Sequence, residues 1–249
     1  MPKIKKLNPD NFELECTTVW SFARRGKWAT HNSKYRGNWA PEVVRNLILR
    51  YSKEGDFLLD PMVGGGTSAI EAKLLNRNLL ALDINPNAID LTKNALNFEC
   101  EFNPKIKIMQ NDSRDLSFLK NESIDLVLFH PPYADIIKYS NKEIDGDLSN
   151  IHNLDDFSNE IEIIAKELYR VLKKDKFCAV LIGDTRRNKM YQPLAFKVME
   201  RFLKVGFTLK EDIIKHQHNC KATGFWVNKS KEYNFLLIMH EHLFIFKKV

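Results

Sequence analysis

The chain has 249 residues, 44% of them hydrophobic, and a mean hydropathy of −0.36. This length and composition allow one globular domain with a large core. No run reaches the roughly 18 apolar residues of a membrane-spanning helix, and residues 1–6 lack the apolar stretch of a secretory signal. We therefore expect a cytoplasmic protein with no membrane partner.

The net charge of +6 is unevenly distributed along the chain. Residues 57–184 carry 14 basic and 21 acidic side chains, whereas residues 185–231 carry 11 and 3. A basic edge beside an acidic centre suits a catalytic domain that contacts nucleic acid, although a solvated lysine-rich surface would look the same. The four cysteines form no Cys-x-x-Cys pair, which argues against a disulfide framework and against a zinc nucleobase deaminase.

Strand and helix patterns alternate along the chain. A helix with proline in its first turn is predicted at 41–51. Strands are predicted at 57–59, 79–82, 105–109, 124–129 and 177–182, with helices at 67–75, 86–100, 155–173 and 193–205. Two longer strands at 207–215 and 233–247 complete the pattern. It indicates one α/β domain over 1–249, with a doubly wound, mostly parallel seven-stranded sheet and an antiparallel C-terminal hairpin.

A glycine-rich loop joins the strand at 57–59 to the next helix. It reads Asp60-Pro61-Met62-Val63-Gly64-Gly65-Gly66-Thr67-Ser68. Three glycines let the backbone approach a ligand closely, and Thr67 or Ser68 can cap the helix. No lysine follows, which argues against a Walker P-loop. Ala69 stands where a dinucleotide fingerprint has its third glycine, an allowed replacement that leaves this alternative open.

Three carboxylates follow three successive strands. Asp60 would repel a pyrophosphate and could instead hold an ammonium group. Asp83, at the end of the second strand, can bind ribose hydroxyls. Asp112, after the third, could accept a hydrogen bond from an adenine amino group. Each alone could be a turn former or a helix cap, but together they fit S-adenosylmethionine.

The tetrapeptide His130-Pro131-Pro132-Tyr133 follows the apolar strand at 124–129. Neither proline can donate to a sheet ladder, so the strand must stop there. The resulting corner suits a planar nucleobase, because its carbonyls can accept from an exocyclic amine while the aromatic ring stacks on the base. An ordinary strand-terminating turn is the alternative.

These motifs together resemble those of the S-adenosylmethionine-dependent DNA amino-methyltransferases, which make N6-methyladenine or N4-methylcytosine. The resemblance covers nearly the whole chain. It implies a class I methyltransferase sheet, S-adenosylmethionine as cofactor, and methyl transfer to a base flipped out of duplex DNA. The residues that it assigns to the cofactor are Asn38, Trp39, Asp60, Pro61, Val63, Gly64, Gly65, Gly66, Thr67, Ser68, Asp83, Ile84, Asn85, Asp112 and Ser113.

By the same resemblance, the catalytic residues are His130, Pro131, Pro132 and Tyr133. His130 and the Pro131 carbonyl would accept from the target amine, and Tyr133 would stack on the base. The family usually has aspartate, asparagine or serine where this chain has His130. A neutral imidazole offers one acceptor nitrogen and could also take up the released proton, or it could only pack. The choice between adenine and cytosine stays open.

Three segments are candidate DNA-contacting elements: 1–40, 134–153 and 216–232. Their partner would be double-stranded DNA. An RNA amino-methyltransferase of the same fold is the alternative. A cognate restriction endonuclease is a further candidate partner, and the oligomeric state, monomer or homodimer, is open. The candidate DNA-binding residues are Arg24, Arg25, Lys27, Lys138, Tyr139, Ser140, Arg186, Arg187, Lys221 and Lys229.

Histidines alternate on the two predicted C-terminal strands. His216, His218 and Cys220 would share one face of a strand, and His240 and His242 one face of another. Their spacing matches no zinc signature, so no metal is predicted.

Overall fold

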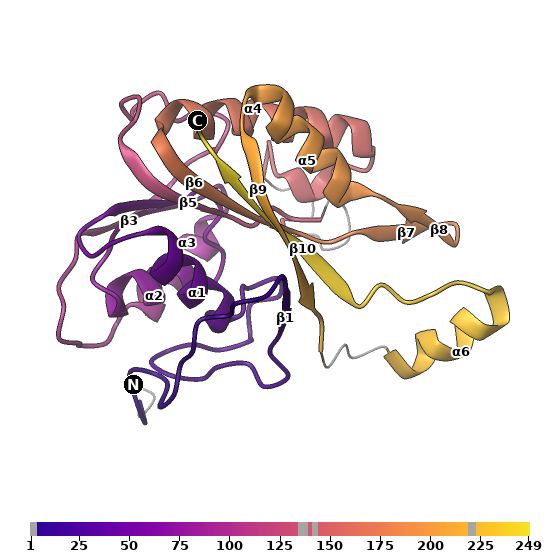
Figure 1. The fold of residues 1–249 in the computed structure, drawn as a ribbon, viewed down its shortest axis with the longest axis horizontal. Coiled ribbons are helices and arrows are strands. Elements are labelled where there is room, and N and C mark those ends of the chain that lie inside the picture. Colours follow the sequence, from indigo (N-terminus) through magenta and orange to yellow (C-terminus); the bar gives the residue numbers. More distant parts are fainter. Residues whose placement is uncertain (1–3, 134–138, 141–143, 219–222) are drawn as a thin grey trace.

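A twisted eight-stranded sheet runs through the molecule, with helices on both of its faces (Figure 1). The computed structural model describes residues 4–133, 139–140, 144–218 and 223–249. The strands of the sheet are, in spatial order, β1 (Val19–Ser21), β9 (Thr208–His216), β10 (His240–Lys247), β6 (Leu172–Ile182), β5 (Ile124–Phe129), β2 (Phe57–Asp60), β3 (Asn78–Asp83) and β4 (Ile106–Gln110).

The strand directions confirm the predicted fold class. Strands β2 to β6 are parallel to one another, whereas β10 runs antiparallel to both β6 and β9. The sheet has one strand more than the seven predicted, because β1 pairs in parallel with β9 at the edge. This strand has only three residues, of which Trp20 alone is buried, so it leaves no periodic pattern in the sequence.

Helices cover the sheet in two layers, and alternate strand residues face one layer or the other. Leu59 of β2 packs in the same cluster as α4 and α5, and its neighbour Leu58 packs with α1 on the opposite face. The parallel strand β5 is buried throughout, as expected for a strand covered on both sides. The helices are α1 (Pro41–Tyr51), α2 (Thr67–Leu74), α3 (Pro86–Ala95), α4 (Leu154–Val171), α5 (Leu194–Val205) and α6 (Thr223–Tyr233), with a short 3₁₀ turn at Leu148–Asn150.

Three predicted boundaries are wrong by five residues or more. The strand predicted to begin at 177 begins at Leu172. The helix predicted to reach residue 100 ends at Ala95, because a turn follows in which the Phe98 N–H donates to the Leu96 carbonyl at 2.8 Å. The strand predicted at 233–247 begins only at His240, since α6 precedes it. Asn234 takes a left-handed φ of +53° and ends α6.

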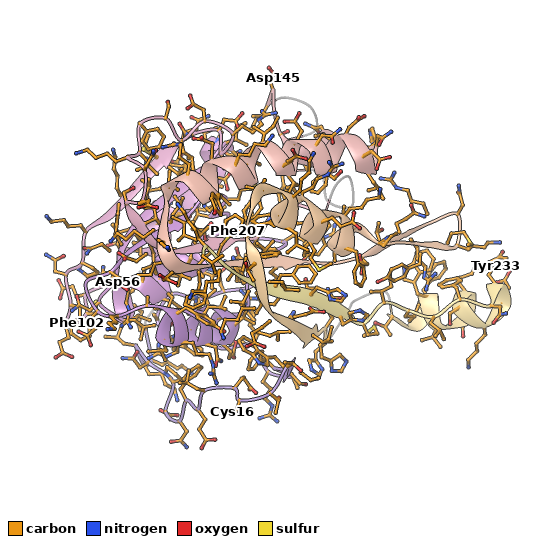
Figure 2. The ribbon with its side chains drawn as sticks, turned by 45° about the horizontal axis from the view of Figure 1, so that its top comes forward. Cys16, Asp56, Phe102, Asp145, Phe207 and Tyr233 are labelled. Atoms are coloured by element: carbon orange, nitrogen blue, oxygen red, sulfur yellow. The ribbon has the colours of Figure 1, made fainter. Side chains whose placement is uncertain are left out.

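A small hairpin and α6 project from the same end of the sheet (Figure 1). The hairpin joins β7 (Thr185–Arg187) to β8 (Met190–Gln192) through Asn188 and Lys189, whose φ angles of +49° and +67° suit a tight two-residue turn. Figure 2 shows the contrast between this end and the core, with Phe207 inside the molecule and Tyr233 at the far end of α6. Among the described residues, no helix combines the length and apolar character that a membrane crossing requires.

A buried carboxylate ties the N-terminal segment to the domain. Glu71 of α2 is fully buried and accepts from Trp28 Nε1 at 2.6 Å, from Arg45 Nη1 at 3.0 Å, and lies 2.7 Å from His31 Nε2. The Arg45 guanidinium also lies over the Trp28 ring. This cluster fixes where residues 28–31 leave the domain surface and therefore where the following residues run.

Glu71→Gln should destabilise the protein by about 3–5 kcal/mol, because it leaves the buried Arg45 guanidinium without its anion. Urea denaturation followed by circular dichroism measures the loss. Glu99→Gln, at an exposed position, is the matched control and should change stability by less than about 0.5 kcal/mol. Equal stabilities of the two variants would contradict the anchoring role.

Candidate active site

A pocket lies where the carboxyl ends of β2, β3, β4 and β5 meet, the usual place for a ligand in an open α/β sheet. It encloses about 740 Å³ of space, part of which is open solvent. Eleven of the predicted cofactor and catalytic residues line it: Asn38, Trp39, Val63, Gly64, Asp83, Ile84, Asn85, Asp112, Ser113, His130 and Pro132.

The other predicted cofactor and catalytic residues do not line the pocket: Asp60, Pro61, Gly65, Gly66, Thr67, Ser68, Pro131 and Tyr133. The Asp60 carboxylate is fully buried and accepts from the Met62 N–H at 3.0 Å and from the Ser68 hydroxyl. Burial raises the pKa of Asp60 to about 7. Asp60 therefore shapes the loop from behind, and direct contact with an ammonium group stays a prediction.

The glycine loop is held between Asp83 and the N-terminal segment. The Asp83 carboxylate accepts from the N–H groups of Gly64 and Asn85, each at 2.9 Å, and burial raises its pKa to about 6. The Gly65 N–H donates to Asn38 Oδ1 at 3.0 Å. A Cβ atom at Gly65 would lie 2.5 Å from the Asn38 side chain, so only glycine fits beneath this segment.

The prediction that Thr67 or Ser68 caps the following helix is wrong. Gly66 occupies the cap position with a left-handed φ of +85°, and no side-chain cap bond is present. Ser68 instead donates to Asp60, and the Thr67 hydroxyl donates to the Trp39 carbonyl at 3.4 Å. Both hydroxyls thus fasten the loop to its surroundings.

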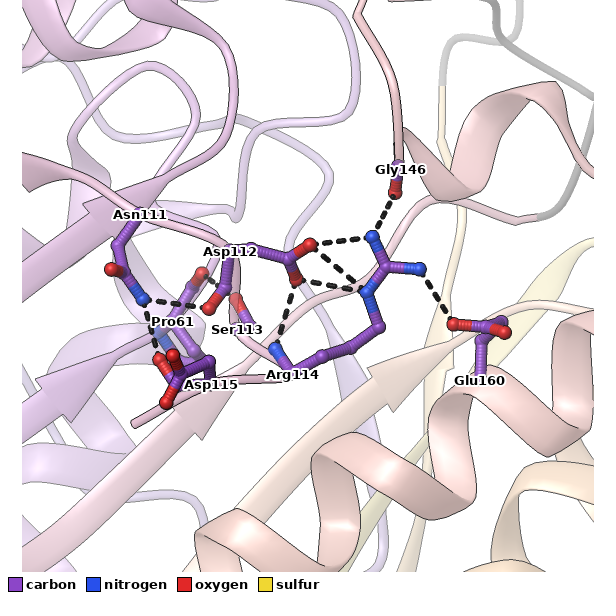
Figure 3. Close-up of polar contacts among 8 residues, drawn as sticks. All are labelled: Pro61, Asn111, Asp112, Ser113, Arg114, Asp115, Gly146 and Glu160. Carbon is purple, nitrogen blue, oxygen red and sulfur yellow. Dashed lines mark hydrogen bonds and ion pairs between the residues drawn. The ribbon is translucent and has the colours of Figure 1, made fainter. Parts of the chain in front are cut away.

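Asp112 lies in a network around Arg114 (Figure 3). The Arg114 Nε donates to both Asp112 oxygens at 3.0 Å, Nη1 donates to Glu160 at 2.7 Å, and Nη2 to the Gly146 carbonyl at 3.3 Å. A Cβ at Gly146 would lie 2.0 Å from Nη2, and its φ is +81°. Arg114 thereby balances the Asp112 charge and draws the chain around Gly146 against the pocket.

Sequence reasoning missed part of the pocket lining, namely Met62, Gly146, Asp147, Leu148 and Ile164. The 3₁₀ turn begins beside Asp147, whose carboxylate accepts from the Ser149 N–H at 2.8 Å. Residues 146–148 fell within the segment 134–153 predicted to contact DNA. The sequence Gly146-Asp147-Leu148, a turn signal before an apolar residue, was the available signal.

Two tyrosines form an aromatic wall of the pocket. The rings of Tyr35 and Tyr139 stack with centroids 5.7 Å apart, and the Tyr139 hydroxyl donates to the Arg36 carbonyl at 3.2 Å. Ser140 is buried and donates to Asp147 at 2.5 Å. Tyr139, predicted to contact DNA, therefore lines this pocket, and Ser140, predicted likewise, is bonded to the lining residue Asp147.

His130 is held between Trp39 and Tyr133. The Trp39 ring meets it edge-on, with centroids 5.0 Å apart, and His130 Nε2 lies 2.9 Å from the Tyr133 hydroxyl. Burial lowers the pKa of His130 to about 4, so its imidazole is neutral at neutral pH. The Tyr133 ring packs on Gly183, where a Cβ would lie 2.8 Å from it.

The other predicted DNA-binding residues differ in what their side chains contact. Arg25 is turned inward and donates to the carbonyls of Asn38 and Trp39, while Arg186 donates to the Leu236 carbonyl at 3.0 Å. Arg24 and Lys27 are exposed. Arg187 donates to the His152 carbonyl, and Lys229 pairs with Glu232 at 2.7 Å. Lys138 and Lys221 lie outside the described residues.

Asp184, His240 and His242 bring three potential metal-ligating atoms within 4.8 Å of one another. Asp184 already accepts from the Tyr191 hydroxyl, and His242 Nδ1 lies 3.1 Å from Asp212. Two of the three groups thus already have protein partners, and we assign no metal to the cluster. The remaining histidines considered are His216 and His218, whose rings lie 4.1 Å apart, while Cys220 lies outside the described residues.

Sequence comparison matches the chain to the profile of the N6/N4 DNA methylase family over residues 2–94 and 124–249. The chain belongs to this family. S-adenosylmethionine is the cofactor that the family uses. The match includes the glycine loop, Asp83 and the tetrapeptide that begins at His130, and it omits the residues around Asp112.

The curated relatives match only part of the chain. An uncharacterized protein of Methanocaldococcus jannaschii is 31% identical over 62% of the chain, and the Type II methyltransferase M.HpaI of Haemophilus parainfluenzae is 37% identical over 39%. A tRNA (guanine(10)-N2)-dimethyltransferase of Methanothermobacter thermautotrophicus is 30% identical over 40%. The chain matches 48%, 28% and 29% of these proteins' own lengths, respectively.

The fold is shared with solved methyltransferases. A SAM-dependent methyltransferase from Methanosarcina mazei superposes with a TM-score of 0.57 at 14% identity, and the match covers 82% of this chain and 97% of that one. At this identity the likeness establishes the class I fold.

Asp60→Asn should remove a pH-dependent loss of stability. The folded state raises the pKa of Asp60 from 3.8 to about 7, so between these values the folded protein binds more protons than the unfolded chain. The free energy of unfolding therefore falls as the pH rises through this window, by up to about 1.4 kcal/mol per pH unit.

Urea denaturation at several pH values between about 4 and about 7 measures this decline. The decline should be shallower for Asp60→Asn than for the unsubstituted protein. Asp90→Asn, on the exposed side of α3, should follow the unsubstituted protein. Parallel pH profiles for Asp60→Asn and the unsubstituted protein would show that Asp60 is not the group responsible.

Proposed function

We propose that this protein transfers a methyl group from S-adenosylmethionine to an exocyclic amine, N6 of adenine or N4 of cytosine, in duplex DNA. The main support is that one pocket is lined both by the glycine loop with Asp83 and by His130 with Pro132. Methyl donor and target base would meet between these two walls. Membership in the N6/N4 DNA methylase family supports the same chemistry.

The residues of the pocket fit the cofactor. Asp83 uses each carboxylate oxygen for one backbone N–H and keeps lone pairs for ribose hydroxyls. Tyr35 and Leu148 add apolar walls of the kind that hold an adenine ring. Trp39 Nε1 is a buried donor without a partner among the described residues, as expected where a ligand completes the wall. When bound, the cofactor supplies an electrophilic sulfonium methyl group.

The base-facing residues act by accepting hydrogen bonds. The lone pair of an exocyclic amine is delocalised into the ring, which makes the nitrogen a poor nucleophile. A neutral His130 and the Pro131 carbonyl would each accept one amine hydrogen and favour a tetrahedral nitrogen with its lone pair free. Fixed acceptors of this kind lower the barrier without reorganising during the reaction. With a pKa of about 4, His130 would pass the released proton on to water.

The projecting end of the molecule is the proposed DNA-reading surface. Helix α6 has no buried residue and exposes Phe225 and Trp226. Lys189 of the β7–β8 turn lies over the Tyr233 ring at 3.7 Å, which joins the hairpin to α6. A basic arm with exposed aromatic side chains suits a DNA groove, and residues 185–231 carry the excess of basic side chains.

Single-molecule sequencing of DNA from a host that expresses the protein tests the proposed function. A methylated adenine or cytosine in a fixed motif is expected, and His130→Ala should abolish it. Unmodified DNA together with methyl transfer to tRNA in vitro would replace DNA by RNA as the substrate, the reading that the tRNA methyltransferase relative favours. We further propose a cytoplasmic restriction-modification setting, in which the modified DNA resists the cognate endonuclease.

Asp83→Ala should weaken S-adenosylmethionine binding by about 10- to 100-fold, because it removes charge-assisted hydrogen bonds to the cofactor. Isothermal titration calorimetry measures the affinity. Asp90→Ala, exposed on α3, is the control and should bind normally. Unchanged affinity in Asp83→Ala would remove Asp83 from the cofactor site.

Lys229→Ala with Lys231→Ala should weaken DNA binding and reduce the salt dependence of log K by about one unit of slope per lysine. Fluorescence anisotropy over a range of salt concentrations measures this slope. The control is Lys105→Ala with Lys107→Ala, two exposed lysines at the opposite edge of the sheet. If both double variants lose slope equally, α6 has no special role.

A further inference from the structure

Four polar side chains form a continuous row that ends at His130. Lys215 Nζ donates to Glu241 Oε2 at 2.6 Å, and Glu241 Oε1 accepts from the Tyr133 hydroxyl. The Tyr133 oxygen lies 2.9 Å from His130 Nε2. These residues come from β9, β10 and the loop after β5, and Glu241 is 108 positions from Tyr133 in the sequence.

The sheet places the two charged members opposite each other. Lys215 and Glu241 are directly paired in the antiparallel register of β9 and β10, and on β9's other side Lys215 pairs with Trp20. Directly opposed residues bring their side chains into contact. Burial raises the pKa of Glu241, but the charge of Lys215 and the hydrogen bonds from Lys215 and Tyr133 outweigh it, so the net shift is downward and Glu241 stays ionised.

The direction of each hydrogen bond follows from the chemistry of the groups. A lysine ammonium can only donate and a carboxylate can only accept. The single hydroxyl hydrogen of Tyr133 therefore goes to Glu241, and its oxygen can only accept from His130. Nε2 must carry the hydrogen, and in a neutral imidazole Nδ1 is then the bare acceptor.

We propose that Lys215 and Glu241 are positioning residues of the methyl-transfer site, which hold His130 in the Nε2–H tautomer so that Nδ1 accepts a hydrogen from the target amine. The effect on the target amine rests on the proposed function, whereas the tautomer follows from the hydrogen bonds alone. A histidine can stand at this position, which lines the pocket, because the row leaves one of its ring nitrogens as an acceptor.

Glu241→Gln should reverse the direction of the hydrogen bonds between residue 241, Tyr133 and His130. Lys215 still donates, so the glutamine must turn its oxygen toward Lys215 and its NH₂ group toward Tyr133. The Tyr133 hydroxyl then donates to His130 Nε2, and Nδ1 carries the hydrogen. In the double variant with Lys215→Met, the glutamine oxygen is free to accept from Tyr133, and the original direction returns.

Proton–nitrogen NMR correlation of the histidine rings in the full-length protein reads the tautomer without any need for activity. The Nε2–H form is expected for the unsubstituted protein and the double variant, and the Nδ1–H form for Glu241→Gln. An Nε2–H tautomer in Glu241→Gln would overturn the proposal. If that variant does not fold, Tyr133→Phe replaces it: a mixture of tautomers is expected, and a pure Nε2–H form would overturn the proposal.

Kinetics supply the second measurement. Glu241→Gln should lower kcat by roughly 10²–10⁴-fold with KM for DNA and cofactor affinity little changed, since an acceptor has become a donor. The double variant should recover most of this loss, and Glu211→Gln, on β9 outside the row, should retain full activity. A double variant no better than Glu241→Gln would indicate a merely structural role. If Glu241→Gln switches the tautomer but the unsubstituted protein methylates no DNA, the assigned tautomer stands and the proposed function is contradicted.

Discussion

The buried carboxylate of Glu71 is the interaction on which the active site depends. An ion taken out of water is costly unless donors surround it, and Glu71 meets Trp28, His31 and Arg45. Because two of these partners belong to the N-terminal segment and Glu71 belongs to the helix after the glycine loop, the contact sets the distance between segment and loop. Asn38 then reaches Gly65, and Trp39 reaches His130.

The packing of the N-terminal segment on the glycine loop also affects the carboxylates at the carboxyl edge of the sheet. Asp60 and Asp83 are buried close to each other, and burial raises the pKa of both. Each is held by backbone N–H groups, not by a cationic side chain. Asp112, by contrast, is balanced by Arg114. The part of the pocket near the glycine loop is therefore the part where a positively charged ligand gains most, which is consistent with a sulfonium cofactor.

The sequence was sufficient wherever structure is local. The strands that end at Asp60, Asp83 and Phe129 are mostly apolar, and the residues at their ends could be assigned to one edge of the sheet because parallel strands all point the same way. The directions and contacts of individual side chains could not be predicted from the sequence. Arg25 reads as a free surface charge but donates to the backbone of Asn38 and Trp39, and Tyr139 reads as a loop aromatic but stacks on Tyr35. Neither contact has a periodic signature.

The same limit explains why the role of His130 could not be read from its neighbours in the chain. Its acceptor nitrogen depends on Glu241, and that pairing depends on the register of β10 against β9 across the long connection that contains α6. An aspartate at this position would place a negative charge beside the base. The row of side chains instead keeps the charge two hydrogen bonds away, where Lys215 neutralises it, and presents a neutral acceptor to the amine. The C-terminal strand thereby becomes part of the active site, and changes at Lys215 or Glu241 should alter catalysis although neither residue lines the pocket.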